Sequence, residues 1–413
     1  MASITSLPLH LVSDILCMLG NIEHLPAALL SNRIFYTAYL DTPSLAVDIL
    51  RLQLPDDLLG LALAAHASQK RIRDKHGVDA ARFLTECYDR PSSAQAHLAL
   101  DDALQISRVD DALAQLRGEF CETTLRKLHG LRRDEPMSAA LSAGELYRVS
   151  RALYRFQIYG NLFLDAGEAS GHGEAHKALF FDRHSPWVNE QLACICDYLE
   201  TRLSGVMLTI LSATPACRDV MVNGFEVGGN LTDWLAERSQ LFEEQRCLSL
   251  PLPRLHQILQ ASTREEWEAS LSGMNNLCQS CLEEDLATFN RGKRPEAAHG
   301  IWREEDMDKL AQQVDADDAT DDHPRSIWSK VYYDRMHGRF RFGEHAISAM
   351  RFVYGLRGIG YVIWDGQRMQ DEAFQCGGWH SFTAPLSGTC IFAIHVSDAA
   401  NQEDRAAILP GYA

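Results

Sequence analysis

Hydrophobic residues recur at helical spacing through the first fifty positions of the chain. Leucine and isoleucine side chains three and four positions apart between residues 11 and 19 share one helix face. A second apolar run predicts one helix from about Leu25 to Tyr39. That helix must end before Pro43, because the residue preceding a proline disfavours the helical conformation, and a third helix starts near Ser44. The pattern predicts three short helices at the N-terminal end.

Two further helix starts stand out in the middle of the chain. Ser142 and Glu145 have the spacing of a capping box, in which two side chains bond each other's backbone amides. The helix that they open is expected to run to about Phe163. Ser185 is a good N-cap residue, and Pro186 after it suits the first helical position. A second long helix is therefore expected to begin there.

The remaining pattern decides the fold class. No repeat of about 20–50 residues follows residue 60, and alternating β-branched runs are rare, so short strands are expected at most near 360–364 and 390–396. We predict a mostly α protein, with a three-helix N-terminal segment packed on a large non-repetitive helical domain. The expected divisions are an N-terminal segment 1–55, a main helical domain 56–310, an acidic linker 311–324 and a C-terminal basic and aromatic part 325–413 of the main domain.

Composition narrows the class of protein. The 413 residues are 46% hydrophobic and 23% charged, which is typical of a soluble globular protein, and the net charge of −17 excludes an all-over basic coat for nucleic acid. The eleven cysteines are scattered without the spacing of a disulfide framework, which is typical of a protein whose thiols are reduced. The apolar stretches 58–67 and 203–216 are too short to span a membrane, and no secretory signal is visible. We expect a cytoplasmic or nucleo-cytoplasmic protein.

Charge changes sign in the last third of the chain. Residues 301–322 hold nine acids and two bases, whereas residues 323–368 hold eight bases and three acids. The eight bases are Arg325, Lys330, Arg335, Arg339, Arg341, Arg351, Arg357 and Arg368. Aromatic residues lie between them, so this segment could hold an RNA end through phosphate contacts and base stacking. Pairing of these arginines with the neighbouring acidic run is the alternative interpretation.

The two central helices each carry a charged stripe. Arg148, Arg151 and Arg155 recur on one face of the first, and Glu190, Asp197 and Glu200 recur on one face of the second. Two interpretations stay open for stripes that face each other. They form a structural ion-pair network, or the carboxylates are partly buried in a pocket. In a pocket they would recognise a cationic substrate or act as general bases.

The first fifty residues resemble an F-box. The similarity lies in Leu7-Pro8, in the pair Ile15-Leu16, and in the segment 29–36, which reads LLSNRIFY. This resemblance implies that the three helices dock a Skp1-type adaptor of a ubiquitin ligase. It also provides one candidate function, a substrate-recruiting F-box adaptor without enzymatic activity.

A second resemblance covers the whole chain. The runs 152–163, 185–194 and 360–365 resemble a family of fungal F-box-like proteins, to which the arginine-containing cyclodipeptide synthases of fungal secondary metabolism are similar. Those enzymes draw arginine and a second amino acid from aminoacyl-tRNAs and join them into a diketopiperazine. The family is associated with a DDxxE motif. The nearest match here is Cys196-Asp197-Tyr198-Leu199-Glu200, with cysteine at the first position.

The second resemblance implies roles for the charged stripes. Asp197 and Glu200 would be the catalytic residues, serving as base or as the anchor for the arginine side chain, with Glu190 as a substrate-binding carboxylate. The arginine stripe would hold the 3′ end of arginyl-tRNA and of one other aminoacyl-tRNA. An aminoacyl ester is already activated, so no cofactor is expected. No metal is expected either, because His172 and His176 with the glutamate between them lack the zincin order, and a lone CxxC at 278–281 lacks a second pair.

Overall fold

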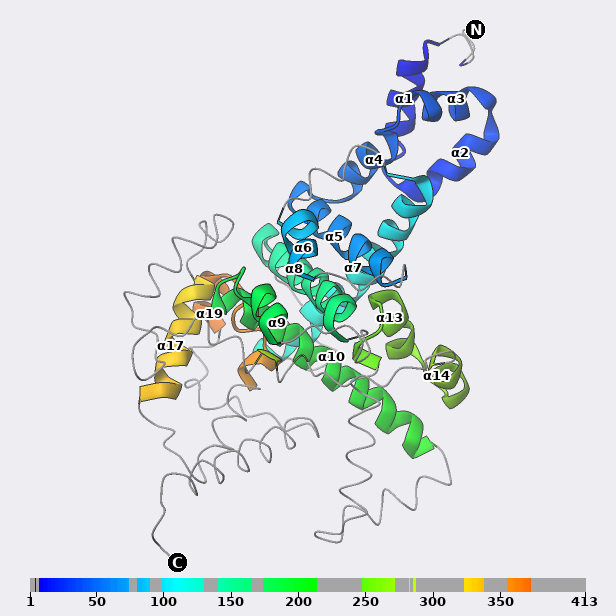
Figure 1. Ribbon diagram of the computed structural model, residues 1–413. Coiled ribbons are helices and arrows are strands. Elements are labelled where there is room, and N and C mark those ends of the chain that lie inside the picture. Colours follow the sequence, from blue (N-terminus) through cyan, green and yellow to red (C-terminus); the bar gives the residue numbers. More distant parts are fainter. Residues whose placement is uncertain are drawn as a thin grey trace, which may run out of the picture.

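The residues that the computed structural model describes are mostly helical and contain no strand (Figure 1). The described residues are 4, 7–73, 80–89, 98–129, 140–164, 174–213, 247–271, 282, 285–286, 323–337 and 355–372. The predicted mostly α fold is confirmed. Residues 360–364, where a short strand was considered, form a turn, and residues 390–396 lie outside the described part.

The N-terminal segment forms a small lobe of short helices. They are α1 (Leu9–Cys17), the 3₁₀ turn η2 (Ile22–His24), α2 (Leu25–Ser31), α3 (Arg33–Asp41) and α4 (Leu45–Gln53). The single helix expected over 25–39 is wrong, because the chain is extended at Asn32. The Asn32 side chain accepts a hydrogen bond from the Ile34 amide and starts a new helix there. The third predicted helix is α4, which begins one residue after Ser44.

The rest of the described chain builds a larger helical body. Its elements are α5 (Asp56–Arg73), α6 (Ala80–Phe83), the π turn η3 (Leu84–Tyr88), α7 (Leu100–His129), α8 (Ala143–Tyr159), the π turn η5 (Gly160–Leu164), α9 (Glu174–Phe181), α10 (Pro186–Ala213), α13 (Leu252–Gln260), α14 (Arg264–Leu271), α17 (His323–His337) and α19 (Gly366–Glu372). Helix α8 opens with the predicted capping box, and α10 begins at the predicted proline. None of the described helices is long and apolar enough to cross a membrane.

Helix α7 joins the lobe to the body. Its 30 residues correspond to a length of about 45 Å, and in Figure 1 the lobe lies at one end of the molecule. Gln53 of α4 connects the two parts, because its Nε2 donates to Ser107 Oγ of α7 at 2.8 Å and its Oε1 accepts from the Ile22 amide at 3.4 Å. The lobe therefore contacts α7 through side-chain hydrogen bonds as well as through apolar packing.

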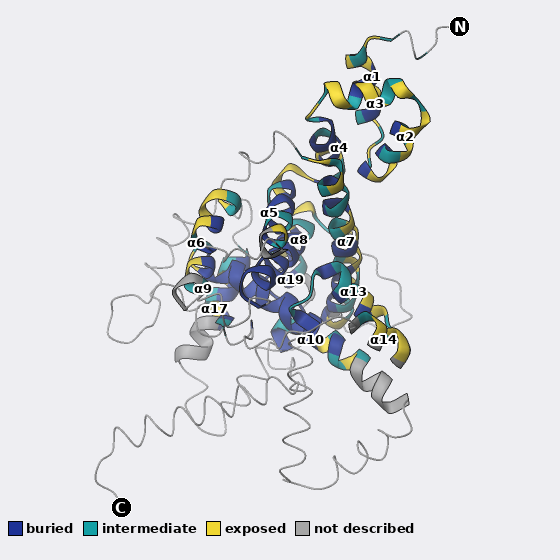
Figure 2. Cartoon of the chain, turned by 45° about the vertical axis from the view of Figure 1, so that its right-hand side comes forward, coloured by how far each residue is buried: buried dark blue, intermediate teal, exposed yellow. Residues whose placement is uncertain are grey.

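The core of the body lies around α8 and α10. Every residue from 148 to 159 of α8 and from 186 to 200 of α10 is buried, and the first part of α10 appears dark blue in Figure 2. Exposed residues are instead prominent on the lobe and on α14. Because the two predicted charged stripes lie within these buried stretches, their charges require partners inside the protein.

A tight turn from the C-terminal segment closes this core. Trp364 is fully buried, stacks on Phe120 of α7 at a centroid distance of 6.2 Å, and donates from Nε1 to the Ile359 carbonyl at 2.5 Å. Gly360 has φ +67°, and a Cβ there would lie 3.2 Å from the Trp364 Nε1 and 3.4 Å from Phe120. Glycine is required at this position both by the backbone conformation and by the close ring. The turn places Arg357 beside the buried face of α10.

Candidate functional site

All six predicted site residues are buried in the body. The exposed fractions of the residues are 5% for Arg148, 3% for Arg151, 0% for Arg155, 4% for Glu190, 9% for Asp197 and 2% for Glu200. Charged residues are almost never buried to this extent unless they are paired. The stripes predicted from the sequence therefore belong to the interior, and their function depends on what each charge contacts there.

The arginine stripe of α8 faces the beginning of α10. Arg151 donates to Gln191 Oε1 at 2.8 Å, and Arg155 donates to the Val188 carbonyl at 3.0 Å and to Asn189 Oδ1 at 2.7 Å. These hydrogen bonds place the two helices side by side with their polar positions in contact. These three hydrogen bonds go to neutral amides and a carbonyl on α10, and no charge pattern in the sequence indicates them.

The third arginine of the stripe, Arg148, forms hydrogen bonds with the C-terminal segment 355–369. Arg148 Nε donates to the Ile363 carbonyl at 2.6 Å, and its other end bonds the Asp365 carboxylate. Next to it, the capping-box residue Glu145 accepts from Arg368 at 2.7 and 2.8 Å. Segment 355–369 is thus fastened to α8 by charged hydrogen bonds, which are stronger than neutral ones.

The acidic stripe of α10 meets Arg357 from that same segment. Glu190 accepts two bonds from its guanidinium, from Nε at 2.6 Å and from Nη2 at 3.1 Å, and Asp197 Oδ1 lies 3.5 Å from Nη1. We expected the basic C-terminal residues to bind RNA or to pair with the adjacent acidic run. For Arg357 and Arg368 the structure shows buried carboxylates of α10 and α8 as partners instead.

Glu190, Asp197 and Arg357 together form what we call the charge cluster, and Asp197 is its carboxylate with the weaker contact. Both carboxylate oxygens of Asp197 are buried, and neither forms a hydrogen bond with the described part of the chain, the Arg357 guanidinium being an ion-pair contact at 3.5 Å. Burial raises its pKa from the ordinary 3.8, the Arg357 guanidinium opposes the increase, and the charge of Glu190 adds to it, so the pKa lies at about 7. A carboxyl group that titrates near neutral pH can both take up and release a proton. Glu200 is buried on α10 three residues further on.

The other sequence motifs provide no site that can be described. The side chains of His172 and His176 and the CxxC at 278–281 lie outside the described residues, as does most of the linker 311–324, whose last two residues begin α17. In the described part, no group of three or more histidine, cysteine, aspartate or glutamate residues is arranged to hold a metal ion.

The lobe carries a second candidate surface. Seven of the eight large apolar side chains that are exposed in the described part lie on the lobe: Leu11, Ile15, Met18, Leu30, Tyr36, Leu40 and Leu52. We call these seven residues the lobe surface. Leu30 is 89% exposed and Met18 is 83% exposed. A concentration of apolar exposure in one small part of a protein is typical of an interaction surface.

Because no known protein matches the chain, its function is inferred from the geometry of the structure. No protein-family description, curated protein or solved structure matches the chain. The buried cluster around Asp197 and the lobe surface are therefore the two features from which we infer a function.

Proposed function

We propose that this protein is a tRNA-dependent, arginine-containing cyclodipeptide synthase of the kind found in fungal secondary metabolism. The observation that supports the proposal is the Asp197 carboxylate, which is buried beside Arg357, forms no hydrogen bond with any residue that the structure describes, and has a pKa of about 7. Groups with such shifted pKa values concentrate at catalytic sites. The motif that the resemblance carries to residues 196–200 includes this aspartate.

The proposed reaction needs a base at each of its two bond-forming steps. The α-amine of one aminoacyl-tRNA attacks the ester carbonyl of the other, an amide bond forms, and the ester bond to the tRNA ribose breaks. Asp197 takes the proton from the attacking amine and returns it to the departing ribose oxygen. A second attack within the resulting dipeptidyl ester closes the ring and releases the second tRNA. Glu200 is the second carboxylate that we assign to these proton transfers.

Arg357 and the α8 arginines have a different proposed role. The bidentate bond from Arg357 occupies Glu190, and the Arg148, Arg151 and Arg155 guanidinium groups donate to the protein. We therefore assign to Glu190 and the three arginines the positioning of α8, α10 and segment 355–369 around Asp197. This assignment replaces the direct binding of tRNA and substrate that we expected from the sequence.

Expression of the whole chain in bacteria tests the proposal. Cells that make the protein and are fed isotopically labelled arginine should release a diketopiperazine that carries the label, detected by mass spectrometry of the medium. The purified protein should form the same product from arginyl-tRNA and a mixture of other aminoacyl-tRNAs. A soluble, folded protein that forms no arginine-containing diketopiperazine in either assay would contradict the proposal.

The lobe surface favours a second candidate function, an F-box-type adaptor that docks a Skp1-type protein of a cullin ubiquitin ligase. If this function holds, the chain should co-purify with such a protein. Leu30→Glu should then weaken the complex by about tenfold or more, because it places a charge in an apolar contact. The free energy of unfolding of the Leu30→Glu variant should differ from that of the wild type by less than about 0.5 kcal/mol, because Leu30 is exposed. Pull-down and isothermal titration calorimetry measure these effects.

Leu179→Glu provides the matched control. Leu179 is the exposed large apolar residue of the described part that lies outside the lobe, on α9, with an exposed fraction of 39%. The same change of chemistry there should leave the complex intact. Equal weakening by both variants, or no complex with the wild-type chain, would rule out docking through the lobe surface.

A further inference from the structure

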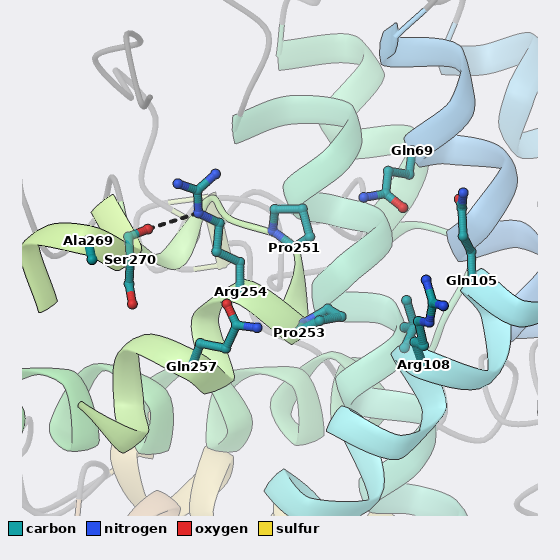
Figure 3. Close-up of a pocket in the computed structure, with 10 residues that line it drawn as sticks. Gln69, Gln105, Arg108, Pro251, Pro253, Arg254, Gln257, Ala269 and Ser270 are labelled. Atoms are coloured by element: carbon teal, nitrogen blue, oxygen red, sulfur yellow. Dashed lines mark hydrogen bonds between the residues drawn. The ribbon is translucent and has the colours of Figure 1, made fainter. Parts of the chain in front are cut away.

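The body has a cavity that is open to solvent and lies away from the charge cluster. It has a volume of about 470 Å³ and lies where α5, α7, α13 and α14 meet (Figure 3). Ligand sites of proteins are concave and usually measure about 300–1,000 Å³. The cavity therefore has the size of a small-molecule site, and its lining residues decide what kind of molecule it suits.

Its lining is polar and contains two arginines. Arg108 comes from α7 and Arg254 from α13, while Gln69, Gln105 and Gln257 come from three different helices. Among the residues that the structure describes, no acidic one lines the cavity, although the chain as a whole carries a net charge of −17. An anion is favoured at such a place, because two guanidinium groups attract it and no lining carboxylate repels it.

The two arginines are used differently by the protein. Arg254 Nε donates to the Ser270 carbonyl at 2.9 Å, which ties α13 to α14 across one side of the cavity, as the dashed line in Figure 3 shows. Arg108 is exposed and has no hydrogen bond or ion pair with any described residue. The side-chain amides of Gln69, Gln105 and Gln257 likewise form no hydrogen bond with any described residue. These groups remain free, within the described part, to bond a ligand.

The combination of groups matches a nucleotide. A guanidinium group forms paired hydrogen bonds to phosphate oxygens, and a glutamine amide can donate and accept at the edge of a base. Val109 and the two prolines Pro251 and Pro253 add an apolar wall against which a flat ring can pack. A simple inorganic anion would use the arginine and leave the amides and this wall without contacts.

We infer that this cavity binds a nucleoside monophosphate, with the phosphate on Arg108 and the base among the glutamine amides and the apolar wall. The inference is independent of the cyclodipeptide synthase proposal, because the cavity shares no residue with the charge cluster. It assigns a binding site to a part of the body that the predicted motifs do not include.

Calorimetric titration of the whole chain with adenosine 5′-monophosphate tests the inference. Saturable binding at one site is expected, with adenosine and inorganic phosphate each binding at least about tenfold more weakly, because each makes only part of the contacts. Arg108→Gln should weaken binding of the monophosphate by about tenfold or more, because it removes the charged hydrogen bonds. Gln257→Ala should weaken the monophosphate and adenosine by similar factors and leave phosphate unchanged.

Arg82→Gln is the matched control. Arg82 is an exposed arginine on α6 that pairs with Glu86 at 2.7 Å and does not line the cavity, so its loss should leave the titration unchanged. Inorganic phosphate that binds as tightly as the monophosphate would overturn the inference. Arg108→Gln with wild-type affinity and an intact fold, or absence of binding to the wild-type chain, would overturn it as well.

Discussion

Asp197→Asn is expected to reduce diketopiperazine formation by about 100-fold or more while leaving the protein folded. The reason for the loss is that an amide cannot take a proton from the attacking amine, and general bases contribute factors of this size. Asparagine has nearly the shape of the protonated aspartate, so the packing of α10 is preserved. Mass spectrometry of the product and circular dichroism of the purified variant measure the two effects.

The same variant should be more stable than the wild type at neutral and alkaline pH. The pKa of Asp197 is raised in the folded protein to about 7, compared with an ordinary value of 3.8. Between these values the unfolded chain has lost the proton that the folded protein keeps, so stability falls as pH rises from about 4 to 7. Above pH 7 the full cost is present, roughly 2–4 kcal/mol, and the asparagine variant lacks it. Denaturant unfolding from pH 4 to pH 8 measures the difference.

Asp110→Asn is the control for the activity assay. Asp110 on α7 is also a largely buried carboxylate with a raised pKa, caused mainly by burial, but it accepts a hydrogen bond from the Tyr154 hydroxyl at 2.9 Å. It lies outside the charge cluster, so the variant should retain product formation. An active Asp197→Asn variant, or equal losses in the two variants, would show that Asp197 is not the base.

Arg357→Gln should destabilise the folded protein by about 3–5 kcal/mol, because it removes the charged, bidentate bond to the buried Glu190 carboxylate. The double variant Arg357→Gln with Glu190→Gln should recover much of this loss, since it removes both charges and leaves two amides that can bond each other. Urea unfolding at pH 7 of the wild type, the single variant and the double variant provides the comparison.

The exposed ion pair between Arg82 and Glu86 provides the reference loss of stability for this experiment. Arg82→Gln breaks the surface contact with Glu86 and should cost less than about 1 kcal/mol. A loss of that small size in Arg357→Gln would mean that water reaches and solvates the Glu190 carboxylate. Failure of the double variant to recover stability would mean that Arg357 acts through packing and not through its charge.

Local signals predicted much of the helical framework. The capping box at Ser142 and the proline at residue 186 predicted where α8 and α10 begin, because caps depend on neighbouring residues only. The break at Asn32 had such a signal too, since asparagine is a favoured N-cap, but the apolar pattern around it continues through the break.

The charge cluster was predictable only in part. The 3.6-residue period placed Glu190, Asp197 and Glu200 on one face of a helix, and that face is buried. The partner of Glu190 comes from 167 residues away, and no local pattern joins the two positions. Arg357 was one of eight similar bases in the sequence, and its role depends on the turn at Gly360 that brings it to α10. Pairing over such distances is a property of tertiary packing.

The pairing of segment 355–369 with α8 and α10 has a consequence for how the chain is made. A ribosome adds about 5–20 residues per second, so roughly ten to thirty seconds pass between the synthesis of Glu190 and that of Arg357. During this interval the carboxylate lacks the Arg357 guanidinium that accompanies it into the interior of the folded protein. We therefore expect the body to complete its folding only after nearly the whole described chain has been translated, and a nascent chain arrested before residue 357 to depend on chaperones.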